Sequence, residues 1–158
     1  MAEAESYPPI SDYALIGDLH SCALVSKAGS IDWCCLPRFD SPSVFGRVLD
    51  WARGGYFQVA AEGTRAVRRR YLPDTKILET TIETESGVAT LTDFMPTHNH
   101  ADPETPFEFG ARQYIARILH CVEGQVRFSL ICRPRFDYGS IAPHTLLQGD
   151  HCGIAHGG

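Results

Sequence analysis

Aromatic, acidic and basic side chains gather between residues 31 and 45, where the residue types best suit a binding site. Sugars bind to aromatic faces together with planar hydrogen-bonding groups such as guanidinium and carboxylate. Both kinds of group occur here within a short distance along the chain. The residues are Asp32, Trp33, Arg38, Phe39, Asp40 and Phe45. This composition indicates a sugar-facing edge.

The same residues also fit a purely structural role. In that alternative, Trp33 and Phe45 are core residues. Asp40 and Ser41 cap a following helix, and Arg38 pairs with an aspartate to fix the turn. From the residues alone, both interpretations stay open.

Two other groups of polar residues have spacings that chemistry could use. His98, His100 and Asp102 have the spacing of a local metal chelate, but they lie on a proline-rich stretch without a supporting ligand, so a solvated loop is expected. Asp93 ends a predicted strand, where a carboxylate either faces a cleft or bonds to turn backbone. The chain has no GxSxG nucleophile elbow and no phosphate-binding glycine fingerprint. We therefore predict no catalytic residue, no metal site and no cofactor in this chain.

Composition and charge limit the class of protein. The 158 residues are 44% hydrophobic and 21% charged, which is typical of one globular domain. The net charge of -5 repels a polyanion, so nucleic acid is not an expected partner. The local cluster of four arginines between Arg65 and Arg70 fits a solvated strand edge, because charged side chains on edges block unwanted pairing.

The sequence favours a cytoplasmic protein with reduced cysteines. Residues 1–11 are acidic and include two prolines, which is unlike a secretory signal. No apolar run approaches the roughly 20 residues of a membrane helix, so no membrane partner is expected. Three of the six cysteines lie inside apolar strand-like runs, which predicts buried, reduced thiols.

The elements that must position these residues are strands. Only residues 43–51 have helical spacing, with Val44, Val48 and Trp51 at i, i+4 and i+7. The predicted fold is therefore all-β, an antiparallel β-sandwich with one short helix. A polar connection is expected over 95–110, and the strands at 113–122 and 125–132 should form a long hairpin through Glu123-Gly124. The other strands are expected at 13–17, 21–25, 31–36, 56–60, 66–72, 77–84, 88–94 and 145–147.

One long stretch carries a resemblance to a known family. The sequence of residues 29–50 is GSIDWCCLPRFDSPSVFGRVLD, and it resembles the signature at the start of bacterial glycoside hydrolase family 15 proteins, the glucoamylase- and trehalase-like enzymes. Residues 10–18, 70–80 and 91–96 resemble the same domain in the same order. Together these stretches extend the resemblance over about residues 7 to 135.

The resemblance implies that residues 1–158 form one N-terminal super-sandwich domain, which a catalytic (α/α)6 barrel follows in full-length members. Two glutamates of that barrel act as general acid and general base in inverting hydrolysis of α-glucosidic bonds, with carboxyls roughly 6.5–9.5 Å apart. No glutamate of this chain matches either position, so the chain alone is expected to be inactive. The barrel is then the expected partner and an α-glucoside the ligand class. The residues expected to border the substrate cleft are Trp33, Pro37, Arg38, Phe39 and Asp40.

Three functions compete at this stage. The first is a non-catalytic accessory domain of a family 15 enzyme. The second is a free carbohydrate-binding module that uses Trp33, Arg38 and Phe39. The third is a structural domain that forms a homo-oligomer through the apolar surface that an absent barrel would leave uncovered.

Overall fold

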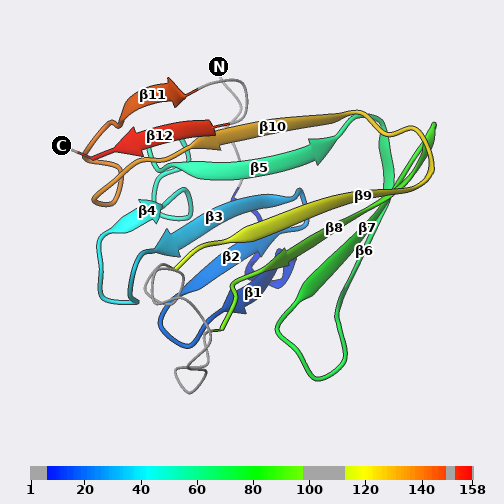
Figure 1. Cartoon of the computed structure of the whole chain (residues 1–158), viewed down its shortest axis with the longest axis horizontal. Helices are drawn as coiled ribbons and strands as arrows, with labels where there is room; N and C mark the ends of the chain where they lie inside the picture. The colour runs from blue at the N-terminus through cyan, green and yellow to red at the C-terminus, as the bar shows by residue number, and fades with distance from the viewer. Residues whose placement is uncertain (1–6, 98–112, 149–151, 158) are drawn as a thin grey trace.

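Two antiparallel sheets face each other in the computed structural model, which describes residues 7–97, 113–148 and 152–157 (Figure 1). The strands are β1 Tyr13–Gly17, β2 Cys22–Ser26, β3 Ser30–Cys35, β4 Ser43–Phe45, β5 Tyr56–Ala61, β6 Thr64–Tyr71, β7 Leu78–Thr84, β8 Gly87–Phe94, β9 Ala116–Gly124, β10 Phe128–Arg133, β11 His144–Gln148 and β12 Cys152–His156. Sheet A has the order β1-β2-β3-β5-β10, with β4 paired to β3. Sheet B has the order β6-β7-β8-β9, and β11 and β12 form a separate pair.

Most strands lie where the sequence predicts them, because their alternating side chains bury one face. In β7, Leu78, Thr80 and Ile82 are buried, while the residues between them are partly exposed. The predicted all-β antiparallel sandwich is confirmed. The sequence did not indicate β12, nor the three-residue 3-10 helix Ile10–Asp12 before β1. His98, His100 and Asp102, expected to lie on a solvated loop, are outside the described residues.

The predicted helix over residues 43–51 is wrong. Ser43–Phe45 form β4, which pairs with β3, and a series of turns follows. The backbone N–H of Gly46 donates to the carbonyl of Gly55 at 3.1 Å, so the turns fold back onto the end of β4. The Asp50 carboxylate accepts two backbone N–H groups of the next residues, a local pattern that competes with helical hydrogen bonding.

The predicted hairpin over residues 113–132 is also wrong. Strand β9 pairs with β8 in sheet B, whereas β10 pairs with β5 in sheet A. In the short link between them, Gln125 N donates to Ser86 O at 3.0 Å and Arg127 O accepts from Glu62 N at 2.9 Å. The link therefore carries the chain from one sheet to the other, and Figure 1 shows β9 and β10 diverging from it at the right.

The core lies between the two sheets. Ile16, Val25 and Ile31 of sheet A and Leu78 and Leu91 of sheet B are buried there. Each such side chain contributes roughly 1.5–3 kcal/mol on burial, which exceeds the contribution of an exposed ion pair.

Strand β6 is an outer strand of sheet B, as the arginine cluster predicts. Arg65, Arg68 and Arg70 are exposed and pair with nearby glutamates at N–O distances of 2.7, 3.4 and 2.7 Å. These charges surround the strand with solvated groups.

The five cysteines that the structure describes are free thiols. Cys34 and Cys35 are buried in β3, and burial raises the pKa of Cys34 to about 12. Cys121 and Cys132 are exposed, so the prediction of buried thiols holds only in part. Among the described residues, no helix has the length and apolar character needed to cross a membrane.

Candidate functional site

The loop between β3 and β4 presents four of the five residues expected at a substrate cleft. Pro37, Arg38, Phe39 and Asp40 are exposed, and the peptide bond before Pro37 is cis. Arg38 Nε lies 3.2 Å from Asp40 Oδ1, a fully solvated pair that adds little stability. Ser41 caps no helix, and its hydroxyl accepts the backbone N–H of Arg38 at 3.1 Å. The loop thus offers a ring, a guanidinium and a carboxylate at the surface.

The turn between β1 and β2 holds this loop in place. The backbone N–H of Phe39 donates to the carbonyl of His20 at 3.0 Å. The buried carboxylate of Asp18 shapes the turn by accepting the backbone N–H groups of His20 and Ser21 at 2.9 and 2.8 Å. The Ser21 hydroxyl donates to the carbonyl of Cys35 at the end of β3. Loop and turn therefore form one hydrogen-bonded unit at this end of the sandwich.

Trp33 lies on the outer face of sheet A rather than on the loop. It stands opposite Leu24 and next to the buried Cys34, and successive strand residues point to opposite faces. Its half-buried ring faces Tyr138, with 6.3 Å between the ring centroids. Trp33 is therefore neither a core residue nor part of the exposed loop.

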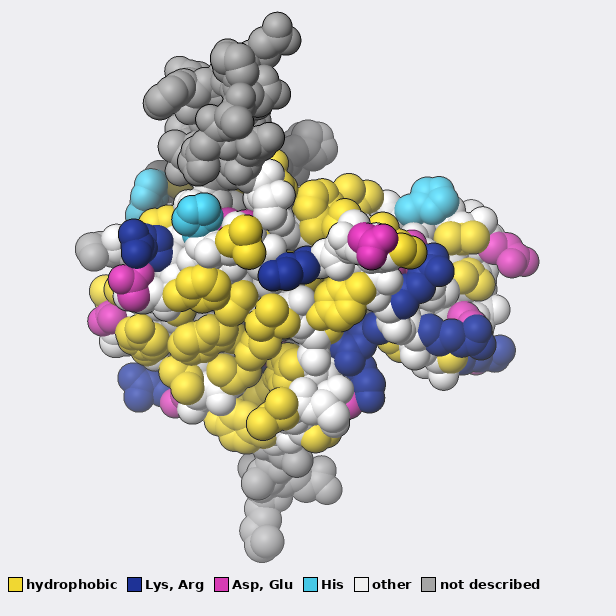
Figure 2. Space-filling model, turned by 90° about the horizontal axis from the view of Figure 1, so that it is seen from below, with side chains coloured by type: hydrophobic (Ala, Val, Ile, Leu, Met, Phe, Trp, Pro, Cys, Tyr) yellow, Lys and Arg dark blue, Asp and Glu magenta, His cyan; other side chains and the backbone are white. Residues whose placement is uncertain are grey.

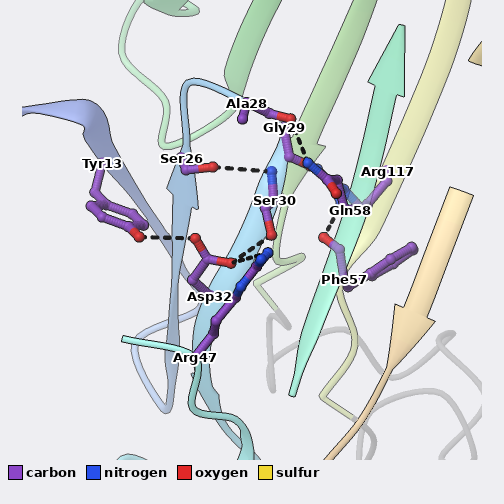
Figure 3. Close-up of polar contacts among 10 residues, drawn as sticks. All are labelled: Tyr13, Ser26, Ala28, Gly29, Ser30, Asp32, Arg47, Phe57, Gln58 and Arg117. Atoms are coloured by element: carbon purple, nitrogen blue, oxygen red, sulfur yellow. Dashed lines mark hydrogen bonds and ion pairs between the residues drawn. The ribbon is translucent and has the colours of Figure 1, made fainter. Parts of the chain in front are cut away.

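Asp32 is buried, and its carboxylate is occupied by neighbours from three segments (Figure 3). It accepts hydrogen bonds from the hydroxyls of Tyr13 and Ser30 at 2.9 and 2.5 Å. Arg47 Nη1 lies 3.9 Å from its Oδ1. Burial raises the pKa of Tyr13, and the hydrogen bond to Asp32 raises it further. Asp32 therefore has a structural role and is not available to a ligand at the surface.

Arg47 connects this carboxylate to the turns after β4. Its guanidinium carbon lies 3.8 Å from the ring centroid of Trp51 and 4.1 Å from that of Tyr56. Such cation–π contacts offset part of the cost of burying the charge. The Nε of Arg47 is buried without a hydrogen-bond partner in the described part of the chain. Sequence inspection missed Arg47, because nothing in its local pattern distinguishes it from a surface arginine.

Among the described residues, Asp93 neither faces a cleft nor bonds to turn backbone, the two roles expected from its position. It is buried and paired with Arg117, whose Nε and Nη2 lie 2.8 and 3.3 Å from the two carboxylate oxygens. Arg117 also donates to the carbonyls of Phe57 and Gly29 at 2.7 and 2.8 Å (Figure 3). Burial raises the pKa of Asp93, and Arg117 opposes this shift. The pair ties sheet B to sheet A.

Residues 2–155 match the family described as trehalase-like, N-terminal. The chain belongs to this trehalase-like N-terminal family. It is 38% identical over 159 aligned positions to a trehalase of Mycolicibacterium smegmatis, which covers 94% of the chain and 24% of that relative. It is 39% identical over 141 positions to a trehalase of Mycobacterium tuberculosis, covering 84% of the chain and 21% of the relative.

A more distant relative is Trehalase 2 of Sulfolobus acidocaldarius, which is 33% identical over 139 positions, covering 88% of the chain and 21% of that protein. The trehalase-like chain thus spans less than a quarter of the length of these relatives. No solved structure matches it.

One apolar hollow of the trehalase-like domain lies on the side where β1 is placed. Figure 2 looks at this side, where hydrophobic side chains gather beside a group of Lys and Arg side chains. The hollow has a volume of about 370 Å³, and its lining residues are Tyr7, Pro8, Ile10, Tyr13, Leu15, Leu24 and Val48. Its two tyrosine hydroxyls are bonded within the protein, to Asp32 and to the backbone N–H of Trp51. The hollow therefore lacks the several unoccupied polar groups that a sugar requires.

No group of three or more His, Cys, Asp or Glu side chains suited to a metal ion occurs among the described residues.

Proposed function

We propose that this chain is the non-catalytic N-terminal domain of a family 15 glycoside hydrolase that cleaves an α-glucosidic bond. The observation that carries the proposal is the match of residues 2–155 to the trehalase-like N-terminal family together with the greater length of the trehalase relatives. The catalytic groups then belong to an (α/α)6 barrel in the remaining part of such a protein, and the trehalase relatives favour trehalose as the substrate. The domain supports the barrel by packing against it.

We also propose that the loop after β3 borders the substrate cleft. Pro37, Arg38, Phe39 and Asp40 are exposed and are not needed for the core. The hydrogen bond from Phe39 N to the neighbouring turn holds the loop in a defined position, which favours a positioning role. Trp33 lies on the adjoining strand β3, where its half-buried ring faces Tyr138, and its place at the cleft border stays a prediction.

The cytoplasmic location, the single-domain extent over residues 1–158 and the self-association expected from the sequence stay predictions.

The central test compares the chain alone with a chimera. In the chimera, the region of the M. smegmatis trehalase that this chain matches, 24% of that protein, is replaced by residues 1–158. We expect no glucose release from trehalose by the chain alone and clear release by the chimera. A truncated relative that lacks the matched region serves as control and should be inactive. Turnover by the purified chain, or a folded chimera without activity, would overturn the proposal.

The cleft-border role is tested in the same chimera with Phe39→Ala and Arg38→Ala. If the loop contacts the bound sugar, each change should raise KM for trehalose by roughly tenfold with little change in kcat. Leu49→Ala, an exposed residue on a different turn, is the matched control and should leave KM unchanged. Equal KM values for all variants would remove the loop from the cleft.

A further inference from the structure

The two sheets of the sandwich do not end together. At one side, β6 lies opposite β1 and β2, because Tyr71 contacts Leu15 and Arg69 contacts the carbonyl of Val25. At the other side, β9 lies opposite β5, because Arg117 donates to the carbonyl of Phe57. Sheet A continues beyond β5 to β10, whereas sheet B ends at β9 in the described part of the chain. Strand β10 therefore has no sheet B strand opposite it.

The inner face of β10 is apolar and uncovered. Leu130 and Cys132 stand opposite Val59 and Phe57, whose side chains pack in the core, so they point to the same side of sheet A. Leu130 is nevertheless 64% exposed, and Cys132 is also exposed. An inward-pointing leucine with this exposure marks an interior that is open to solvent.

The inner face of β9 is uncovered in the same way. Leu119 and Cys121 stand opposite the buried Leu91 and Ala89, yet both are exposed, Leu119 by 42%. A hollow of about 740 Å³ reaches this region, with Cys121 in its lining. We call this part of the molecule the open flank, defined by Leu119, Cys121, Leu130 and Cys132.

The outer faces of the same strands also carry exposed apolar residues, next to polar ones such as His120 and Ser129. Ile118 and Val122 of β9 are 53% and 56% exposed, and Ile131 of β10 is also exposed. Strand β9 thus exposes large apolar side chains on both of its faces, which is typical of a surface that another element covers and not of a solvated edge. Solvated edges usually carry charges that prevent pairing, as β6 does.

We infer that the free edge of β9 binds a further β-strand, which extends sheet B, covers the inner face of β10 and belongs to the part of a longer trehalase-like protein beyond these residues. The inference rests on the proposed function, since it takes the strand from the rest of that protein. The relatives supply ample length, because the chain spans only 21–24% of them. The strand should carry apolar residues at alternate positions to face Leu130, while its backbone pairs with β9.

A second copy of the chain does not fit this edge. Paired strands lie about 4.8 Å apart, so a second β9 would occupy the position opposite β10. Its own β5, which lies opposite β9 in each copy, would then coincide with β10. A strand without a sheet A of its own avoids this collision.

The experiment follows alkylation of the open-flank thiols by iodoacetamide, measured for each cysteine by mass spectrometry. Cys121 and Cys132 are compared between the isolated chain and the trehalase chimera. We expect both thiols to be alkylated in the isolated chain, Cys132 more slowly because burial raises its pKa, and each at least roughly tenfold more slowly in the chimera, because a paired strand covers them. The control is Arg68→Cys on β6, where the arginine side chain is 79% exposed, which should react equally in both proteins.

The outcomes separate this inference from the proposed function. A chimera that hydrolyses trehalose but leaves Cys121 and Cys132 as reactive as in the isolated chain overturns the inference and keeps the function. Protected thiols in an inactive chimera keep the inference and overturn the function. Thiols that are already protected in the isolated chain, and become reactive on dilution, would assign the flank to a second copy and overturn the inference.

A chimera that does not fold is replaced by the M. smegmatis trehalase itself. Cysteines are then placed at its positions aligned with the open-flank residues Leu119 and Leu130 and, as control, with Arg68. Slow alkylation at the first two positions with fast alkylation at the third supports the inference. Fast alkylation at all three overturns it.

Discussion

The two flanks of the sandwich are held by different kinds of side chain. On the closed flank, defined by Leu15, Arg69 and Tyr71, the Tyr71 hydroxyl accepts the N–H of Leu15 at 2.9 Å and donates to its carbonyl at 2.8 Å. Arg69 donates to the carbonyl of Val25 at 3.1 Å. On the open flank, the side chain of Arg117 reaches across from β9 and donates to the carbonyls of Phe57 and Gly29. Beyond Arg117, the open flank offers apolar groups to solvent.

This difference shows that the side chains of an edge strand can indicate whether the sheet ends at that strand or continues beyond it. On the closed flank, the Tyr71 hydroxyl occupies the backbone N–H and carbonyl of Leu15, and exposed ion pairs lie along β6, which disfavours pairing with another strand, although apolar side chains of β1 and β2 line the hollow on that side. On the open flank, β9 carries Ile118, Leu119 and Val122, which are too apolar for a permanent edge. The two flanks therefore differ in their side chains: those of the closed flank suit a permanent sheet edge, whereas those of the open flank suit a position beside another strand.

The strongest way to break the comparison is Arg117→Met. The change removes the guanidinium paired with the buried Asp93 carboxylate, and it removes one donor each from the carbonyls of Phe57 and Gly29. Leaving a buried charge unpaired costs about 3–5 kcal/mol. We expect a fall of that size in the free energy of unfolding, measured by urea denaturation of the isolated chain. A loss below about 1 kcal/mol would mean that Arg117 does not hold the open flank.

The pH dependence of this variant gives an independent check. Without Arg117, burial alone acts on Asp93 and raises its pKa, so the folded state binds the proton more tightly than the unfolded chain. The free energy of unfolding of Arg117→Met should therefore rise as the pH falls toward 3.8, the ordinary pKa of the group. The matched variant on the closed flank is Tyr71→Phe. It removes a neutral, exposed hydroxyl and should cost only about 1 kcal/mol.

Strand positions followed from the sequence because alternation is a local property. Residues such as Leu78, Thr80 and Ile82 alternate with exposed ones whichever strand lies beside them. Pairing is not local. Glu123-Gly124 has the composition of a hairpin turn, and Gly124 has a φ of +66°, yet the chain there crosses between sheets. The deciding contact is Gln125 N to Ser86 O, which links residues far apart in sequence.

The helix over residues 43–51 failed for a related reason. The spacing of Val44, Val48 and Trp51 fits a helical face, but a stretch this short gains little from helix formation alone. Pairing of β4 with β3 and the bonds of Asp50 to following backbone outweigh that preference. Tertiary contacts therefore determined the secondary structure of this segment.

The candidate site was predictable only in part. The loop residues Pro37 to Asp40 could be recognised as exposed, because proline and polar residues end a strand there. The residues that fix their surroundings could not. Asp18 shapes a local turn whose contact with the loop, from Phe39 N to His20 O, only the folded chain shows, and Arg47 acts through Asp32 on another segment. For such buried polar contacts, the sequence offered one signal, which is that Arg117 is a charged residue on the inner face of an apolar strand.

The smallest expected effect concerns the arginines of β6, and it separates edge protection from stability. Arg65→Leu and Arg68→Leu together remove two exposed ion pairs, with arginine side chains 63% and 79% exposed. Exposed pairs contribute roughly 0–1 kcal/mol each, so the free energy of unfolding should change little. Light scattering should nevertheless rise faster on prolonged incubation, because the edge has lost the charges that oppose pairing with other chains.

Arg53→Leu, an exposed arginine on a turn rather than a strand, is the matched control and should leave the scattering unchanged. A double variant that loses more than about 2 kcal/mol would show that these arginines stabilise the fold, contrary to the distinction between the flanks. A double variant that scatters no faster than the control would show that β6 remains protected by its shape alone. The open flank has no such charges at Ile118 and Val122. In the inference above, the strand that covers β9 is therefore what prevents this edge from pairing with other chains.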